Sequence, residues 1–266
     1  MNPATRDVKR LAKEPELPHC MHRAYGFGFD PKAETYKLVR VAIPFKVHVF
    51  SLRKGGWRLI VNSVLKGLFR FCELWSRAVM KNVAHWCVEL EGEVDHRELG
   101  IAAFDFSDQV FKDVIRIPES LKYRQSTHCK HRCCVVKDCL SMGAMLGGDL
   151  SIELWVMKEY GVEGSWTKLY RVDYMVYHPY RWDTQLEFGL RGEALVYEGQ
   201  HLLVLHPSCG KDFKIVFGRY NSLFNGIFVN YRESLLRLSS PCVRKLEAKL
   251  VTKPDIVKVY HHIGTT

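Results

Sequence analysis

Short apolar segments separated by glycine, proline and polar turns run along most of the chain. Glycine and proline recur so often between Gly26 and Gly226 that long helices have little room. The segments between them are rich in valine, isoleucine and aromatic residues, which is typical of β-strands. Strands are expected at residues 36–41, 47–52, 101–106, 152–157 and 202–205. The pattern predicts a mainly β protein.

A strand–turn–strand unit repeats along the chain. In each copy an apolar strand carries one aromatic residue, and a second aromatic opens the next strand. The second aromatics of the first three copies are Trp57, Phe111 and Trp166, which are 54 and 55 residues apart. A weaker fourth copy places Phe213 a further 47 residues along. A period of about 50 residues is typical of kelch-type blades, so we expect a propeller-like array of four-stranded antiparallel sheets, with a β-sandwich as the alternative.

The aromatic residues of the repeat are predicted to lie in the core. They are Phe50, Trp57, Phe104, Phe111, Trp155 and Trp166. The stretches between copies would supply the other strands, at residues 84–90 and 142–146. Because each blade buries its apolar surface against its neighbours, we expect the loss of one blade to affect the whole domain.

Composition narrows the class of protein. The chain has 266 residues, 47% of them hydrophobic and 26% charged, which is ordinary for a globular protein. No apolar run approaches the ~18 residues of a membrane span, and the first residues lack a secretory signal. Nine cysteines, an odd number, favour reduced thiols in the cytoplasm, with the nucleus as the alternative. The net charge of +10 favours acidic partners without fixing a fold.

Several segments resemble the F-box-associated domain of plant F-box proteins, and in particular its S-locus F-box-like branch. They are residues 2–7 (NPATRD), 25–41 (YGFGFDPKAETYKLVRV), 85–86 (HW), 101–119 (IAAFDFSDQVFKDVIRIPE) and 152–172 (IELWVMKEYGVEGSWTKLYRV). The resemblance implies a kelch-like β-propeller domain over residues 1–238. Residues 239–266 are then a C-terminal tail, in which the spacing of Val243, Leu246 and Leu250 predicts a short helix.

The resemblance also implies a function. Such domains select the target protein of SCF-type cullin ubiquitin ligases, while an N-terminal F-box docks on the adaptor. No F-box is expected in this chain, and the fold is expected to be truncated at its N-terminus. A fragment, a shortened gene product and a complete short protein are all left open. We therefore expect a substrate-recognition module that binds a target protein, and that contacts adaptor and cullin only if an F-box lies upstream. A truncated decoy and a ligand- or glycan-binding β domain are the alternatives.

No motif in the sequence indicates an enzyme or a cofactor site. There is no nucleophile elbow, P-loop or zinc-protease motif, and Gly26 and Gly28 lack the third glycine of a dinucleotide fingerprint. These glycines are expected to relieve crowding or to allow a bulge in a strand. We expect neither catalysis nor a cofactor.

Cysteine and histidine cluster at residues 128–139 (HCKHRCCVVKDC). Such ligands suit zinc, but the adjacent Cys133 and Cys134 seldom both reach one tetrahedral ion. The stretch from Cys133 to Val136 also has the composition of a strand, in which buried cysteine packs as a small hydrophobe. Structural cysteines without bound metal are therefore predicted, with zinc binding and redox sensitivity as alternatives.

Two segments are candidates for binding a partner protein. The first is basic, with no acid between Glu119 and Asp138, and its candidate residues are Arg124, Lys130 and Arg132. It would steer an acidic target, or it is simply a solvated loop. The second combines residue types that dominate protein–protein hot spots, and its candidates are Tyr177, Tyr180, Arg181 and Trp182. These side chains would alternatively pack inside or between blades. Nucleic acid is not expected as a partner, because the aromatics do not stand beside the basic residues.

Overall fold

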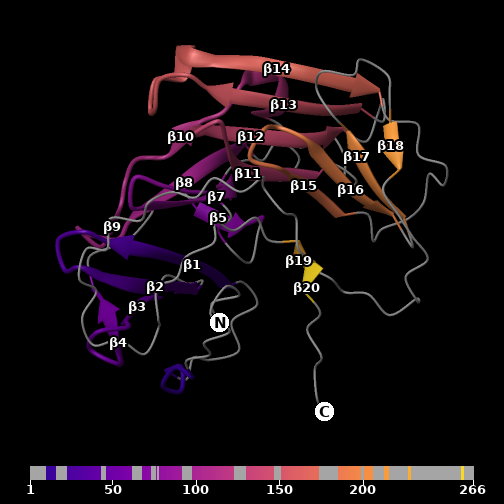
Figure 1. Ribbon diagram of the computed structural model, residues 1–266. Helices are drawn as coiled ribbons and strands as arrows, with labels where there is room; N and C mark the ends of the chain where they lie inside the picture. The colour runs from indigo at the N-terminus through magenta and orange to yellow at the C-terminus, as the bar shows by residue number, and fades with distance from the viewer. Residues whose placement is uncertain are drawn as a thin grey trace.

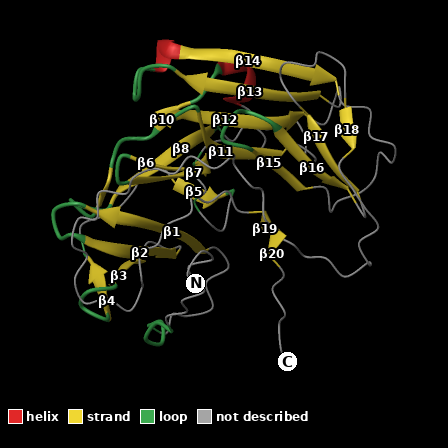
Figure 2. Cartoon of the chain, viewed as in Figure 1, coloured by secondary structure: helices red, strands yellow, loops and turns green. Residues whose placement is uncertain are grey.

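The computed structural model shows a chain built almost entirely of antiparallel β-sheets (Figures 1 and 2). The structure describes residues 10–15, 23–42, 46–61, 68–72, 76, 78–91, 98–122, 130–146, 151–173, 185–198, 201–205, 213–215, 227–228 and 259–260. Within these residues, the sheets follow one another in chain order, from indigo at the start to orange near the end of the chain in Figure 1. We number the four larger sheets blades 1 to 4.

Blades 1 and 2 occupy the first half of the chain. Blade 1 contains β1 (Arg23–Asp30), β2 (Thr35–Ala42), β3 (Lys46–Ser51) and β4 (Gly56–Ile60), paired in that order. Blade 2 contains β5 (Leu68–Phe71), β6 (Ala78–Met80), β7 (Val83–Leu90), β8 (Leu99–Asp105), β9 (Val110–Phe111) and β10 (Ile115–Arg116). Both β5 and β6 pair with β7, and both β9 and β10 pair with β8. Blade 2 is therefore a four-stranded sheet whose two edge strands are each interrupted.

Blades 3 and 4 repeat the arrangement of blade 1. Blade 3 contains β11 (Lys130–Val136), β12 (Cys139–Leu146), β13 (Ser151–Met157) and β14 (Trp166–Asp173). Blade 4 contains β15 (Gln185–Phe188), β16 (Ala194–Glu198), β17 (His201–Leu205) and β18 (Phe213–Ile215). A short helix, α1 (Glu119–Lys122), precedes blade 3, and a 3₁₀ turn, η1 (Glu163–Ser165), joins its last two strands. A fifth, two-stranded sheet pairs β19 (Ile227–Phe228) with β20 (Val259–Tyr260).

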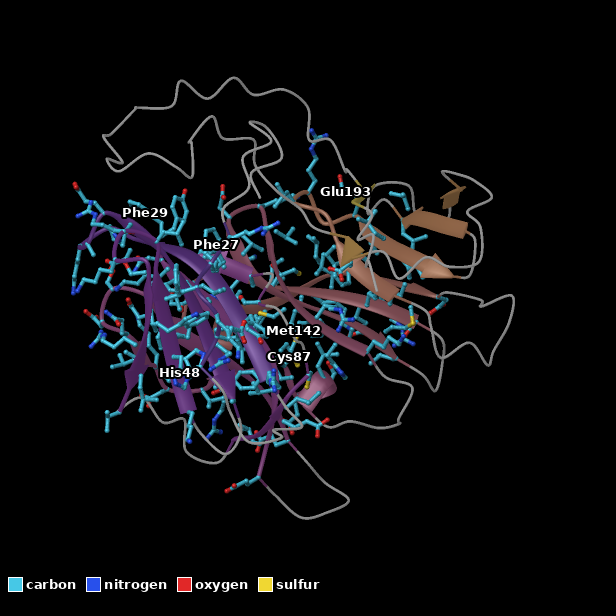
Figure 3. The ribbon with its side chains drawn as sticks, turned by 90° about the horizontal axis from the view of Figure 1, so that it is seen from below. Phe27, Phe29, His48, Cys87, Met142 and Glu193 are labelled. Carbon is cyan, nitrogen blue, oxygen red and sulfur yellow. The ribbon has the colours of Figure 1, made fainter. Side chains whose placement is uncertain are left out.

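Three apolar clusters lie between successive blades and hold them together. The first joins blades 1 and 2 around Trp86 and Phe104, which have no exposed surface. The second joins blades 2 and 3, where Cys87 and Met142 lie close together (Figure 3). The third joins blades 3 and 4 around Phe188. Within the described chain, each blade therefore buries its apolar surface against its neighbours rather than within itself, as the repeat predicts.

Glycines permit the close approach of neighbouring blades. A Cβ atom at Gly28 on β1 would overlap the Phe106 ring of blade 2, and one at Gly143 on β12 would overlap the Phe188 ring of blade 4. Gly26 meets Trp86 in the same way. The prediction that Gly26 and Gly28 relieve crowding is confirmed, and β1 pairs with β2 without an irregularity in register.

The repeat in the sequence corresponds to the third and fourth strands of each blade. Phe50 on β3 pairs with Trp57 on β4, and Phe104 on β8 pairs with Phe111 on β9. The ring centroids of these pairs are 5.3 and 5.2 Å apart. Residues 84–90 and 142–146 lie in β7 and β12, which are second strands, as predicted. The fold class expected from the sequence is thus confirmed.

Burial of the repeat aromatics differs from the prediction in part. Phe50 and Phe104 are buried, but four of the six are only half-buried. The half-buried residues are Trp57, Phe111, Trp155 and Trp166. Trp57, Phe111 and Trp166 lie on the edge strands β4, β9 and β14, and the Trp166 indole donates a hydrogen bond to the Arg116 carbonyl of blade 2 at 2.9 Å. The predicted helix at residues 243–250 lies outside the described residues.

Candidate functional site

Hairpin turns from all four blades gather on one side of the molecule, which we call the turn face. Lys32 of blade 1 contacts Asp108 of blade 2 at 2.5 Å, and the Lys137 amide of blade 3 donates to the Leu190 carbonyl of blade 4 at 2.9 Å. Two of these turns have positive φ at both central residues, Lys81–Asn82 and Lys137–Asp138. That conformation matches the type I′ turn, which fits the twist of a two-residue hairpin. Each of these two hairpins therefore has a tight turn with a restricted backbone conformation.

The opposite side is where β1, β11 and β15 begin, and we call it the linker face. Because neighbouring strands are antiparallel, the first residues of these strands, Arg23, Lys130 and Gln185, lie at the far end from the turns. β11 packs against β6 on one side and against β15 on the other. Lys130 and Gln185 are the first described residues after the candidate binding segments 123–129 and 174–184, and the strands that they begin, β11 and β15, contact each other.

The predicted binding residues are described only in part. Tyr177, Tyr180, Arg181 and Trp182 lie outside the described residues, as does Arg124. Two of the basic candidates, Lys130 and Arg132, are on β11, and both are half-buried.

Arg132 links blade 3 to blade 4. Its Nε atom donates to the Leu186 carbonyl of β15 at 3.1 Å and lies 3.6 Å from the Glu187 carboxylate. The side chain is 21% exposed. Arg132 therefore positions the start of β15, the strand into which segment 174–184 leads.

The comparison with known proteins agrees with this architecture. Residues 1–232 match the family described as the F-box associated beta propeller domain. The chain belongs to this family. Such F-box associated domains are protein-binding modules and are typically non-catalytic.

Similar proteins are found in Arabidopsis thaliana. Over 197 residues the chain is 30% identical to the F-box protein CPR1, covering 64% of this chain and 46% of that protein. It is 28% identical over 208 residues to the F-box protein At4g22390, covering 64% and 47%. The F-box/kelch-repeat protein At3g23880 is 26% identical over 156 residues, covering 54% and 38%. The F-box associated domain described here matches less than half of the length of each relative.

Charged side chains at the end of blade 3 of this F-box associated domain are mutually compensated. The buried Glu153 carboxylate accepts hydrogen bonds from the Trp155 indole and from Lys168, at 2.8 and 2.7 Å. Arg171 lies 3.6 Å from the same carboxylate and 3.6 Å from Asp173, the last residue of β14. Because Glu153 is paired on both sides, its charge stabilises β13 and β14 and is not available to a ligand.

Cys133 and Cys134 of the 128–139 cluster point in opposite directions from β11. Cys133 packs between blades 2 and 3, whereas Cys134 packs between blades 3 and 4. Both thiols are buried on opposite faces of β11 and act as small apolar groups, as the strand-like sequence predicts. Among the described residues, no group of three or more histidine, cysteine or acidic side chains is placed to hold a metal ion.

His85 is a buried histidine on β7. Its Nδ1 atom lies 2.9 Å from the Ala78 carbonyl and therefore carries the proton, while Nε2 accepts a hydrogen bond from the Tyr160 hydroxyl at 2.8 Å. Burial lowers the pKa of His85 to about 4. Burial likewise raises the pKa of Tyr160 to about 12. The pair is neutral near pH 7 and joins blade 2 to blade 3.

One polar cluster of blade 1 is not found by the sequence argument. Arg40 is buried on β2 and contacts Glu14, which lies outside the blade. The only signal in the sequence is a charged residue between the apolar residues Val39 and Val41.

No helix in the described part of the chain has the length and apolar character needed to cross a membrane.

Proposed function

We propose that this domain recognises the substrate of an SCF-type cullin ubiquitin ligase and binds its target protein through the linker face. Membership of the F-box associated beta propeller family supports the role. The contact between β11 and β15, the strands that follow segments 123–129 and 174–184 in the chain, supports the location. Binding residues are commonly carried by loops on a rigid frame, and the interblade clusters supply such a frame.

In this proposal the two segments have different tasks. Tyr177, Tyr180, Arg181 and Trp182 form the centre of the contact, because aromatic residues and arginine carry most of the energy of protein interfaces. Arg124 and Lys130 raise the rate of association with an acidic target. Arg132 contributes from β11 and keeps the neighbouring strand in place.

The partners of the whole ligase enter the proposal on one condition. Adaptor and cullin bind the same polypeptide if it carries an F-box, and the domain then delivers its target for ubiquitination. Assignment to the S-locus F-box-like branch and location in the cytoplasm remain predictions from the sequence. A fluorescent fusion of the full chain in plant cells tests the location.

The experiment compares two multiple variants with the wild-type chain in plant cells. One carries Tyr177→Ala, Tyr180→Ala, Arg181→Ala and Trp182→Ala on segment 174–184. The control carries Lys54→Ala and Glu163→Ala, two exposed residues of the turn face. We expect the wild type and the control to co-purify a protein that the first variant loses. Equal recovery by all three chains would contradict binding at the linker face, provided that the variants unfold at the same urea concentration.

A further inference from the structure

Three side-chain donors from three strands of blade 1 converge on a short segment of the same chain. Tyr25 on β1, Arg40 on β2 and Trp57 on β4 all lie on the face of the sheet that points away from blade 2. Register places them there, because Tyr25 pairs with Arg40, and Trp57 pairs with Phe50 in the row that also contains Leu38. Residues on the other face of the sheet, such as Val39 and Val49, pack against blade 2. We call these three residues, with His48, the Arg40 site.

The segment bound there is Ala12–Pro15, and it is held by polar contacts. The Trp57 indole donates to the Ala12 carbonyl at 3.2 Å. Arg40 donates from Nη1 to the Glu14 carboxylate at 2.8 Å and from Nη2 to the Pro15 carbonyl at 3.1 Å. The Tyr25 hydroxyl donates to the same Glu14 oxygen at 3.2 Å. The site therefore binds two backbone carbonyls, which any sequence supplies, and one carboxylate, which only an acidic residue supplies.

The Arg40 guanidinium requires an anion. Its side chain is 2% exposed and lies over the Trp57 ring, 5.4 Å from the centroid. Burial and, to a lesser extent, the charge of Arg40 lower the pKa of His48. The His48 Nδ1 atom lies 3.5 Å from Nη2 of Arg40, and the ring stays neutral. Among the described residues, the Nε atom of Arg40 has no hydrogen-bond partner. An unpaired buried charge is strongly unfavourable, so a carboxylate bound at the site stabilises the folded chain.

The bound segment is held far less firmly than the site that holds it. Residues 10–13 are exposed, and Leu11 keeps 39% of its surface in contact with solvent. The Glu14 side chain is 40% exposed, against 2% for Arg40. Segments with few buried apolar contacts open at low free-energy cost, whereas the strands that carry the three donors are part of the core. A competing segment would need to replace only these hydrogen bonds.

We propose that the Arg40 site binds peptides that carry a glutamate side chain. The chain's own residues 12–15 occupy it until an extended, glutamate-containing segment of a partner protein displaces them. Exposed apolar groups flank the site on the same face of the sheet. Phe27 is 43% exposed and stacks on Tyr36, and Leu59 is 48% exposed (Figure 3 shows Phe27 and His48 on blade 1). A partner segment longer than residues 12–15 would place apolar side chains against them. This site is separate from segments 123–129 and 174–184, and the proposal does not depend on the function proposed above.

The test uses the full chain and a peptide of residues 10–15 (RLAKEP), blocked at both ends and labelled with a fluorophore. The matched control peptide carries Gln in place of Glu14. Fluorescence anisotropy is measured with the wild-type chain and with the Glu14→Ala and Arg40→Met variants. We expect the Glu14→Ala chain to bind the peptide at least tenfold more tightly than the wild type does. In the wild type the tethered residues 12–15 compete with the peptide for the site, and without the Glu14 carboxylate they compete poorly. The glutamine peptide should bind at least tenfold more weakly, and the Arg40→Met chain should lose this discrimination.

Several outcomes would overturn the proposal. They are the absence of peptide binding to a folded Glu14→Ala chain, equal binding of the two peptides, and unchanged discrimination by Arg40→Met. If Glu14→Ala does not unfold cooperatively in urea, the milder Glu14→Gln chain takes its place in the same anisotropy measurement. This chain should bind the glutamate peptide more tightly than the wild type does and more tightly than it binds the glutamine peptide, and failure of either comparison would refute the proposal. A dimer formed by exchange of residues 10–15, detected by sedimentation, would assign the site to a second copy of the chain instead.

Discussion

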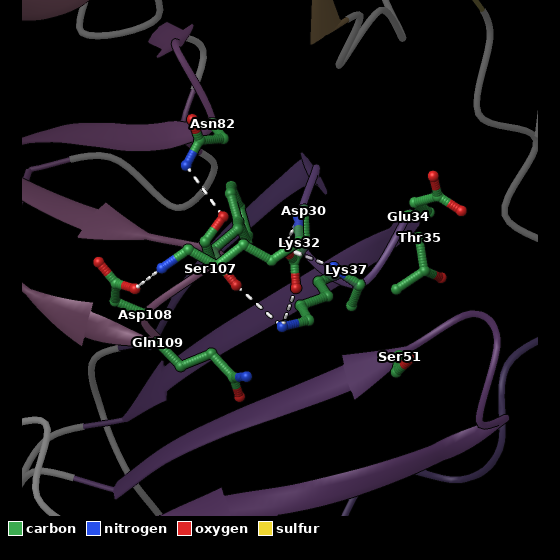
Figure 4. Close-up of polar contacts among 12 residues, drawn as sticks. Asp30, Lys32, Glu34, Thr35, Lys37, Ser51, Asn82, Ser107, Asp108 and Gln109 are labelled. Atoms are coloured by element: carbon green, nitrogen blue, oxygen red, sulfur yellow. Dashed lines mark hydrogen bonds and ion pairs between the residues drawn. The ribbon is translucent and has the colours of Figure 1, made fainter. Parts of the chain in front are cut away.

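The Lys37 ammonium lies 2.5 Å from the Asp30 carboxylate, and the two side chains are only 6% and 2% exposed. Lys37 also donates to the Phe106 carbonyl of blade 2 at 2.9 Å (Figure 4). Burial alone would raise the pKa of Asp30, but hydrogen bonds from Lys37 and from the Ala33 amide outweigh it and hold the pKa below its ordinary value. This ion pair joins the first hairpin of blade 1 to the neighbouring sheet.

Lys37→Met is expected to destabilise the domain by about 3–5 kcal/mol, because it leaves the buried Asp30 charge without a partner. The matched control is Lys32→Ala, which removes an ion pair with Asp108 whose side chains are 70% and 54% exposed. That change should cost far less, because water screens an ion pair between exposed side chains. Urea unfolding of both variants measures the difference. Similar losses for the two lysines would show that the buried pair has no special role.

Gly143→Ala is expected to lower the free energy of unfolding by about 1–3 kcal/mol, because the added methyl group overlaps the Phe188 ring. Gly164→Ala serves as the control, since a Cβ atom there meets no other atom within 4 Å. The second change Phe188→Leu should recover part of the loss in the Gly143→Ala background. Urea unfolding of the single and double variants gives the coupling, and purely additive effects would contradict the overlap.

Acid is expected to weaken the contact between blades 2 and 3 through His85. The folded chain keeps the pKa of His85 at about 4, below its ordinary value of 6.5, so the unfolded chain binds a proton first as the pH falls. Above pH 6.5 the free energy of unfolding should therefore not depend on the protonation of His85. Between pH 6.5 and 4 it should fall by about 3 kcal/mol in total from this residue. Urea midpoints of the wild type and His85→Asn between pH 7 and 5 isolate this effect. A wild type no more sensitive than His85→Asn in that range would disprove it.

The hydroxyl of Tyr160 is expected to contribute about 1–3 kcal/mol, because Tyr160→Phe leaves the buried Nε2 atom of His85 without its donor. The destabilisation should be present at pH 7, where His85 is neutral. Thermal unfolding at that pH measures it, with Tyr36→Phe on blade 1 as the control. An unchanged melting temperature would mean that water satisfies His85 instead.

Arg132→Ala is expected to loosen blade 4 more than blade 1. Its guanidinium is bonded to the Leu186 carbonyl at the start of β15. Hydrogen exchange should therefore become faster at residues 186–188, whereas residues 39–41 of β2 should change little. Equal acceleration in both strands would indicate a global loss of stability and no specific anchoring.

Much of the fold is predictable from the sequence because cross-strand aromatic pairs recur at a fixed spacing. Phe50 with Trp57 and Phe104 with Phe111 are each neighbours in a hairpin, so the order of residues along the chain records their contact. The same local logic places Cys133 and Cys134 on opposite faces of a strand. Such features depend on contacts between residues that are close in sequence.

Features that depend on distant contacts are not predictable in this way. Arg40 is buried beside Glu14, 26 residues earlier, which supplies a carboxylate for its charge. Lys37 pairs with the buried Asp30 and also donates a hydrogen bond to the Phe106 carbonyl, 69 residues later. Trp166 was expected in the core but is half-buried, because its indole reaches across to Arg116 on blade 2. Of the candidate binding site, the sequence indicates the residue types and the segments, while the contact between β11 and β15, the strands that follow these segments, comes only from the packing of the blades.

The pairing of glycine with a large ring also has a consequence for the curvature of the whole array. Gly28 and Gly143 let a ring from the adjoining sheet enter without pushing the two sheets apart, so each pair sets the angle between successive blades. A change in that angle at one interface would tilt all the later blades together, so the displacement would grow with distance along the array.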